Sequence, residues 1–202
     1  MEEQAPKTLD QLTDDDLFRE YEARKGAQSN LMDFIQYAKV DFNPSTHHHY
    51  LSDKLEGVIS GDIKRLIVTM PPRHGKSEMA SRRLPAYYLG RHPTREIICA
   101  TYNSDFAAEF GRNVREIVNT EEFKNIFPEV GIKSTDRAAD RWAVTQGGGF
   151  RAAGVGGGLT GRGGHLIIID DPIKSREEAD SKLQRDRVWD WYRSVVYTRQ
   201  AP

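Results

Sequence analysis

The sequence predicts an α/β fold in which a mainly parallel central sheet is flanked by helices. Residues 96–102 and 166–169 both look like buried strands, and the second is a run of four apolar residues of which three are β-branched. Near-continuous apolar runs of this kind fit parallel strands that are covered on both faces. Segments with helical spacing of apolar residues lie before and between these runs, and such alternation is typical of the α/β class.

Length and composition favour one compact unit. The chain has 202 residues, of which 38% are hydrophobic, and this is enough for a single domain with a substantial core. No apolar run approaches the length of a membrane span, and residues 1–11 are acidic, unlike a signal peptide. Cys99 is the only cysteine, so no internal disulfide is expected, and a reducing, cytoplasmic setting is favoured.

The net charge is close to zero but unevenly distributed. The chain carries 29 basic and 30 acidic residues, and residues 1–20 hold seven of the acids and two of the bases. The remainder has 27 bases and 23 acids, a net charge of +4. This balance neither requires nor excludes DNA binding, which depends on a local basic patch.

The first 60 residues are predicted to be helical. Thr13 is the expected N-cap of a helix that ends near Lys25-Gly26, and Ser29 or Asn30 is the expected cap of a second helix through Ala38. A third helix is predicted over residues 46–60, with Gly61 ending it. We therefore divide the chain into a helical N-terminal segment, residues 1–45, and a main domain, residues 46–202.

Three consecutive histidines open the third predicted helix. Adjacent residues point in different directions on a helix, which makes a shared metal site improbable. His47, His48 and His49 are therefore expected to form a solvated helix start.

The most informative motif follows a predicted strand over residues 63–69. Gly75-Lys76-Ser77 fits the P-loop pattern, in which backbone N–H groups surround phosphates, the Lys reaches the β- and γ-phosphates, and the Ser hydroxyl binds Mg²⁺. The leading Gly of the pattern is replaced by Met70, so the loop is a variant. Gly-Lys-Ser also occurs in ordinary surface turns, but a predicted helix over residues 77–89, interrupted at Pro85, supplies the strand-turn-helix setting of the motif.

Two carboxylates follow the strand predicted over residues 166–169. Parallel sheets bind ligands beyond the carboxyl ends of their strands, so Asp170 is expected beside the phosphate loop if the two strands are neighbours. Asp170 is then the candidate Mg²⁺ ligand, and Asp171 the candidate for orienting or deprotonating the attacking water. The alternative is that the two acids cap the next helix.

More strands are predicted between the two motifs. A helix over residues 104–119 follows the 96–102 strand, and residues 142–145 and 150–153 are predicted to form a hairpin. No guanine-reading Asn-Lys-x-Asp is present. The extra strands favour the ATPase division that contains helicases, translocases and RecA-type (ASCE) motors, so we predict a P-loop NTPase of that division.

A glycine-rich stretch precedes the carboxylates, with ten of the 17 glycines between Gly147 and Gly164. Such a stretch can be a passive connection. Arg162 lies within it and is a candidate arginine finger, a residue that neutralises charge developing during phosphoryl transfer.

Two features of the sequence leave a choice between DNA contact and a structural role. A helix is predicted from the capping box Ser175-Arg176-Glu177-Glu178, and its Trp189 and Trp191 either stack on DNA bases or pack, with packing favoured. The expected packing residues of this helix are Leu183, Val188, Trp191 and Val195. Basic residues after the phosphate loop either contact DNA phosphates or form solvated helix faces: Arg82, Arg83, Arg91, Arg95, Arg112 and Arg115.

Residues 46–202 resemble the N-terminal ATPase domains of the large terminase subunits of tailed bacteriophages. The resemblance rests on the variant phosphate loop, the Thr101-Tyr102 strand end and two further motifs, Leu159-Thr160-Gly161-Arg162-Gly163 and Ile169-Asp170-Asp171-Pro172. It implies an ATP- and Mg²⁺-dependent motor that drives double-stranded DNA into a procapsid in the host cytoplasm. The implied partners are the portal protein, the small terminase subunit and further copies of the chain in a ring of five.

The resemblance also implies roles for individual residues. It makes Lys76 the phosphate-binding lysine, Ser77 and Asp170 the Mg²⁺ ligands, and Arg162 the finger, with Arg73 as its rival. The residues expected to contact the nucleotide are Pro72, Arg73, His74, Gly75, Lys76, Ser77 and Glu78. Asp171 departs from the family pattern, in which many members have Glu. Its side chain is one methylene shorter, so the catalytic carboxylate must lie closer to the nucleotide or act through water.

Family members continue beyond the position where this chain ends. They carry a further strand and then a metal-dependent nuclease domain, so we expect a core truncated at its C-terminus and no nuclease activity. An isolated domain of this kind is expected to be monomeric and nearly inactive if the finger acts between subunits. Two other functions fit the motifs: a helicase-like DNA-remodelling ATPase, and a structural subunit that binds nucleotide without turnover.

Overall fold

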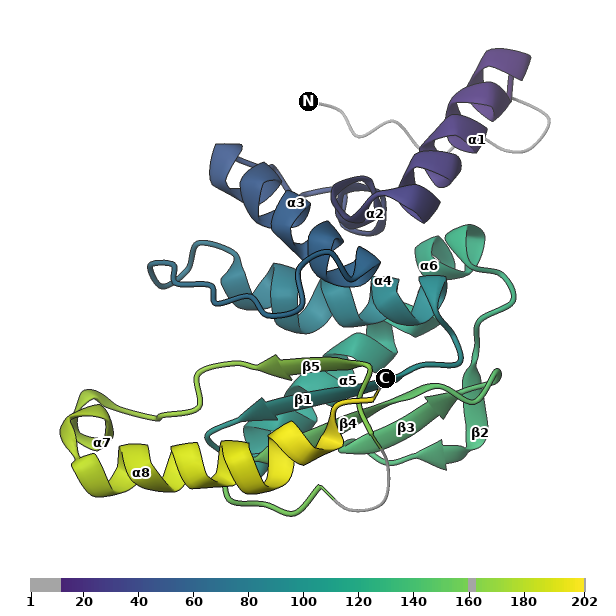
Figure 1. Ribbon diagram of the computed structural model, residues 1–202. Helices are drawn as coiled ribbons and strands as arrows, with labels where there is room; N and C mark the ends of the chain where they lie inside the picture. The colour runs from purple at the N-terminus through teal and green to yellow at the C-terminus, as the bar shows by residue number, and fades with distance from the viewer. Residues whose placement is uncertain (1–11, 160–162, 202) are drawn as a thin grey trace.

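The computed structural model describes residues 12–159 and 163–201 and contains a central five-stranded sheet with helices on both faces (Figure 1). The strand order is β2-β3-β4-β1-β5. The strands are β1 (Glu96–Thr101), β2 (Ile132–Arg137), β3 (Arg141–Val144), β4 (Gly149–Gly154) and β5 (Leu166–Ile169). The α/β class predicted from the sequence is confirmed.

The sheet is mixed rather than mainly parallel. β1 pairs in parallel with β4 and β5, whereas β2 with β3 and β3 with β4 are antiparallel. The short turn between β3 and β4 allows only antiparallel pairing, as the predicted hairpin requires. β2 was not predicted, because its sequence from Ile132 to Arg137 is almost wholly polar. Polar and charged side chains are common in edge strands, which lack a second neighbour.

The N-terminal helices begin where capping residues predict. They are α1 (Asp14–Ser29), α2 (Leu31–Ala38) and α3 (Thr46–Ser60). Thr13 caps α1, Asn30 caps α2, and α3 ends at Gly61, whose φ of 86° suits glycine. α1 runs past its predicted end at Gly26 to Ser29, and Gly26 lies against α2. A Cβ at Gly26 would be 3.0 Å from the Asp33 carboxylate.

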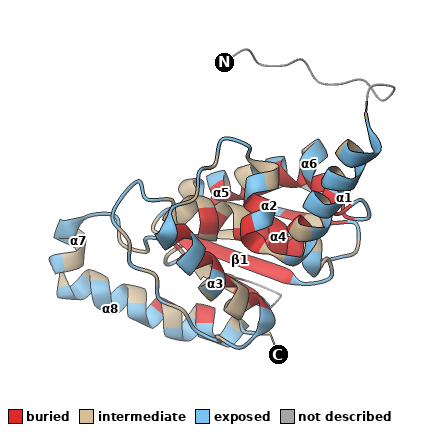
Figure 2. Ribbon diagram, turned by 90° about the horizontal axis from the view of Figure 1, so that it is seen from above, coloured by how far each residue is buried: buried red, intermediate tan, exposed pale blue. Residues whose placement is uncertain are grey.

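One face of the sheet forms the larger hydrophobic core with most of the helices. α4 (Leu84–Arg91), α5 (Ser104–Asn119) and α6 (Glu121–Ile126) complete this layer. Side chains of α2, such as Phe34, belong to the same core as Ile97 and Cys99 of β1. Figure 2 shows the buried residues gathered on α2, α4 and β1. The helical N-terminal segment therefore packs on the main domain through a shared core.

Trp142 is a principal side chain of this core. It stacks on Phe150 across the β3–β4 pair with ring centroids 5.6 Å apart, and its Nε1–H donates to the Gly111 carbonyl oxygen at 2.9 Å. We expect Trp142→Ala to lower the free energy of unfolding by about 3–5 kcal/mol, through the cavity and the lost hydrogen bond. Urea unfolding followed by circular dichroism measures this loss. The matched control is Trp189→Ala on α8 (Lys182–Trp191), because Trp189 is 58% exposed. Equal losses in the two variants would contradict this account of the core.

The opposite face of the sheet is covered by α8 and the π-helix η3 (Tyr192–Val196). Ile98 and Ala100 of β1 pack there with Trp191 and Val196. α7 (Arg176–Asp180) begins at Ser175, whose hydroxyl caps it as predicted. The predicted packing of Trp191 is confirmed.

The predicted packing of Leu183 is wrong, since it is 60% exposed. Figure 1 gives the reason: the first turns of α8 extend past the end of the sheet and have no core to cover. Val188 is partly buried, and Val195 packs against the second cluster.

The strand predicted over residues 63–69 is absent from the sheet. Leu66, Val68 and Met70 pack against the larger core, while Ile67 between them is 91% exposed. The apolar side chains thus alternate in burial as they do in a strand, but the segment carries no ladder of hydrogen bonds. Burial of alternate side chains against the helical layer holds it without strand pairing. No helix in the described part of the chain is long and apolar enough to cross a membrane.

Candidate active site

The candidate phosphate loop, residues 70–77, leads directly into a helix. Gly75 has φ 84° and Arg73 has φ 63°, so both lie in the left-handed region, and helical backbone begins at Lys76. Glycine adopts this conformation without cost, whereas arginine does so rarely. The loop therefore presents backbone N–H groups at the start of a helix, where the helix dipole also favours an anion.

The helix after the loop continues through Pro85. It passes from the π-helix η2 (Glu78–Arg83) into α4, so Pro85 does not shorten the helix, and the interruption predicted there is a π turn. Proline cannot donate a hydrogen bond to the carbonyl four residues earlier and clashes with it in a regular α-helix. The wider π turn before Pro85 relieves that conflict.

Lys76 meets both carboxylates at the carboxyl end of β5. Its Nζ is 3.1 Å from Asp170 Oδ1 and 2.6 Å from Asp171 Oδ1. Burial by itself would lower the pKa of Lys76, but the hydrogen bonds to Asp171 and Asp170 outweigh it, so the pKa of Lys76 is raised. The structure thus brings together the two motifs that the sequence separates, although β5 pairs with β1 and not with residues 63–69.

The two carboxylates occupy different environments. Asp170 is only 6% exposed, and its Oδ2 accepts a hydrogen bond of 2.7 Å from the Ser81 hydroxyl. Asp171 is exposed and has φ 44°, and its carbonyl oxygen accepts a hydrogen bond from the Tyr102 N–H at 3.3 Å. A buried carboxylate in fixed orientation suits an ion ligand, and an exposed one suits contact with water.

Ser81 was missed by sequence reasoning. It lies four residues after Ser77 in the same helix, and this spacing was the available signal. We expect Ser81→Ala to cost about 1–3 kcal/mol of folding stability, because the buried Asp170 oxygen loses its partner. Thermal and urea unfolding measure the loss.

Ser52→Ala is the matched control for Ser81→Ala. The Ser52 hydroxyl is equally buried but has no hydrogen-bond partner among the described residues, so its removal is expected to be close to neutral. A Ser81→Ala protein as stable as Ser52→Ala would show that the bond to Asp170 contributes nothing.

Glu78 and the arginines after it form an ion network beside the loop. Glu78 Oε1 lies 2.9 Å from Arg83 Nε and 3.7 Å from Lys39 Nζ, and its Oε2 lies 3.3 Å from Arg82. Burial would raise the pKa of Glu78, but these cations, Arg83 first, lower it. Glu78 was predicted to contact nucleotide, and here its carboxylate is bound within the protein.

The basic residues after the loop are largely held by the protein itself. Besides the two arginines beside Glu78, Arg91 donates to the Tyr87 hydroxyl and Arg95 to the Tyr88 hydroxyl. Arg112 is exposed on α5. These contacts favour a structural role for most of the basic stretch.

Of the two candidate arginine fingers, Arg73 lies within the described residues. Arg73 is exposed at the tip of the phosphate loop. Arg162 lies outside the described residues.

The histidines at the start of α3 are not all solvated. His47 and His49 are exposed as expected, but His48 is buried and contacts the phosphate loop, so that expectation was wrong for His48. No cluster of three or more potential metal-binding side chains occurs within residues 12–159 and 163–201. Ser77 and Asp170 remain the candidate pair for an ion that phosphate oxygens would also bind.

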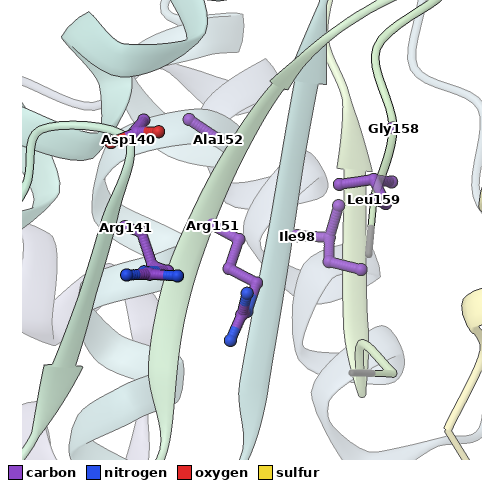
Figure 3. A pocket seen from close by; sticks show the side chains of 7 residues that line it. All are labelled: Ile98, Asp140, Arg141, Arg151, Ala152, Gly158 and Leu159. Carbon is purple, nitrogen blue, oxygen red and sulfur yellow. The ribbon is translucent and has the colours of Figure 1, made fainter. Parts of the chain in front are cut away.

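A separate pocket lies on the α8 face of the sheet (Figure 3). Arg141 and Arg151 extend into it from neighbouring strands, beside Ile98 and Leu159. Glu96 lies 3.6 Å from Arg151 Nε, and Asp140 also lines the pocket. Acidic side chains thus lie near the two arginines, and no residue of 70–77 lines this pocket.

Comparison with known families decides what kind of protein carries this site. Residues 67–201, which are 135 of the 202 residues, match the family described as terminase large subunit, T4likevirus-type, N-terminal. The chain belongs to this family. The match confirms the resemblance seen in the sequence and spans both the phosphate loop and the carboxylates.

Membership in the terminase family indicates a role in packaging phage DNA. Terminase large subunits carry out packaging together with DNA, the portal and the small subunit. No curated protein matches the chain.

Proposed function

We propose that this terminase domain is a P-loop ATPase of the RecA-type division that drives double-stranded DNA into a procapsid. One observation carries the proposal: Lys76 and Asp171, 95 positions apart in sequence, meet at the junction of a left-handed glycine loop, a helix start and a strand end. Lys76, the buried Asp170 carboxylate and the backbone N–H groups at the helix start are together the groups that bind a nucleoside triphosphate and its metal.

The residues of this donor set fit ATP and Mg²⁺. The backbone of residues 72–77 would surround the phosphates. The Lys76 ammonium group, which pairs with Asp170 and Asp171 here, would contact the phosphates instead. Ser77 and Asp170 would hold Mg²⁺, which offsets phosphate charge when bound. Ser81 keeps Asp170 in orientation through its 2.7 Å hydrogen bond.

Asp171 is the proposed catalytic carboxylate. Its side chain is exposed and touches Lys76 at 2.6 Å, so it lies at the site and can reach water. It would orient the attacking water or accept its proton. Arg73, at the tip of the loop, and Arg162 are the candidates for neutralising charge as the phosphoryl group transfers.

The proposed partners follow from the family. The domain would act in the host cytoplasm at the portal of the procapsid, with the small subunit and with further copies of the chain in a ring of five. If an arginine from a neighbouring copy completes the site, the ATPase rate per molecule will rise steeply with protein concentration.

The decisive experiment measures ATPase activity with and without Mg²⁺ and double-stranded DNA, together with strand separation on a duplex substrate. Mg²⁺-dependent hydrolysis stimulated by DNA without strand separation supports the motor. Strand separation would indicate the helicase-like alternative. Tight nucleotide binding without turnover, at every protein concentration and with DNA, would indicate a structural subunit.

A further inference from the structure

His48 connects the start of α3 to the phosphate loop. Its Nδ1 lies 2.9 Å from the backbone nitrogen of Ser45, and its Nε2 lies 3.1 Å from the carbonyl oxygen of His74. His74 immediately precedes Gly75 and Lys76. One imidazole ring therefore bridges the backbone at Ser45 and the backbone at His74, which is 26 positions beyond His48.

The partners of the ring determine its tautomer. The Ser45 N–H can only donate, so Nδ1 must accept and carries no proton. The proton of the neutral ring is then on Nε2, which donates to the His74 carbonyl oxygen. Burial and then the neighbouring His47 lower the pKa of His48, so the neutral form that makes both bonds is favoured.

The ring also lies directly against the backbone of Gly75. A Cβ added at Gly75 would be 2.6 Å from His48 Nε2, and Gly75 has φ 84°. A side chain at position 75 would therefore meet both a steric and a conformational barrier. His48 and Gly75 together fix where the chain turns before Lys76.

We propose that His48 is a positioning residue for nucleotide binding: it holds the phosphate loop at His74-Gly75 in the conformation that presents Lys76. The effect on nucleotide affinity rests on the proposed function, whereas the effect on the loop does not. His48 lies outside residues 67–201, so the family match does not cover it. The start of α3 thereby becomes part of the site.

Two substitutions separate the two bonds of His48. In His48→Asn the amide oxygen stands near the position of Nδ1 and can accept from Ser45, but the side chain is too short to reach His74. In His48→Gln the amide is one bond further out and can donate to His74, while the bond to Ser45 is weakened. His49→Asn, at the exposed neighbouring position, is the matched control.

The test uses the complete 202-residue chain. Hydrogen exchange without nucleotide reports on the amides of residues 73–78, a titration with fluorescent Mg-ADP reports on affinity, and thermal unfolding reports on stability. We expect His48→Asn to speed exchange of the loop and to weaken ADP binding, each by about tenfold, the upper range for one hydrogen bond. His48→Gln should stay within about twofold of the unchanged protein, and His49→Asn should match it.

Loop exchange in His48→Asn at the unchanged rate would overturn the proposal. Faster exchange throughout α3 and the sheet in both His48 variants, with equal losses of thermal stability, would also overturn it, because His48 would then serve folding alone. Faster loop exchange in His48→Asn, with no ADP binding by any protein including the unchanged one, would support the loop role and overturn the proposed nucleotide function.

Discussion

Lys76→Ala is expected to lower ATP turnover by at least about 100-fold, because the variant lacks the charge that stabilises the transferring phosphate. Nucleotide affinity is expected to fall as well, since the role proposed for Lys76 is to contact the phosphates in both the ground state and the transition state. Steady-state ATPase assays give kcat and KM, and equilibrium titration with Mg-ADP gives the affinity.

Lys124→Ala is a suitable control for Lys76→Ala. Lys124 lies on α6 and pairs with Glu121 at 2.8 Å, well exposed and outside the site. Its removal should leave turnover and affinity unchanged. Unchanged nucleotide binding and turnover in Lys76→Ala would contradict a phosphate-binding role for residues 70–77.

Asp171→Asn is expected to lower the hydrolysis rate by about 10²–10⁴-fold, the usual contribution of a positioned general base. ATP binding should persist, because the proposed phosphate and Mg²⁺ contacts come from Lys76, Ser77 and Asp170. Asparagine tolerates the left-handed backbone that Asp171 adopts at φ 44°, so the fold should be retained. Single-turnover hydrolysis and ADP titration together separate chemistry from binding.

Asp180→Asn, on the exposed helix α7, controls for the loss of one negative charge. Asp171→Ala adds a second test, since it also removes the ability to position water. An Asp171→Ala protein with normal hydrolysis would refute the catalytic role of this carboxylate.

Much of the fold was predictable wherever local chemistry decides the structure. Thr13, Asn30 and Gly61 marked helix ends because their side chain or backbone satisfies groups that a helix leaves unpaired. β1 and β5 were predictable from apolar runs, and the hairpin of β3 and β4 from the glycines between them. The nearness of Lys76 to Asp170 was expected on the condition that their strands are neighbours; the strand before the loop is absent, and the two side chains nevertheless meet at 3.1 Å.

The errors fall where distant parts of the chain decide the outcome. Ile67 and its neighbours have the composition of a strand, but strand formation needs a hydrogen-bonding partner, which sequence composition does not reveal. Leu183 has helical spacing, yet its burial depends on how far the sheet extends beneath α8. Ser81 lies in a helix as many serines do, and only its distance to the buried Asp170 shows its role.

Residue type and spacing alone predicted a phosphate loop and paired carboxylates and pointed to the family, because Gly75-Lys76-Ser77 and Asp170-Asp171 are short motifs. Tertiary structure alone decided which side chains surround them. His48 is chemically identical to its exposed neighbours His47 and His49, and it differs only because the fold places the His74 carbonyl and the Gly75 backbone against its ring. Hydrogen bonds across 26 positions depend on three-dimensional approach, which no local pattern encodes.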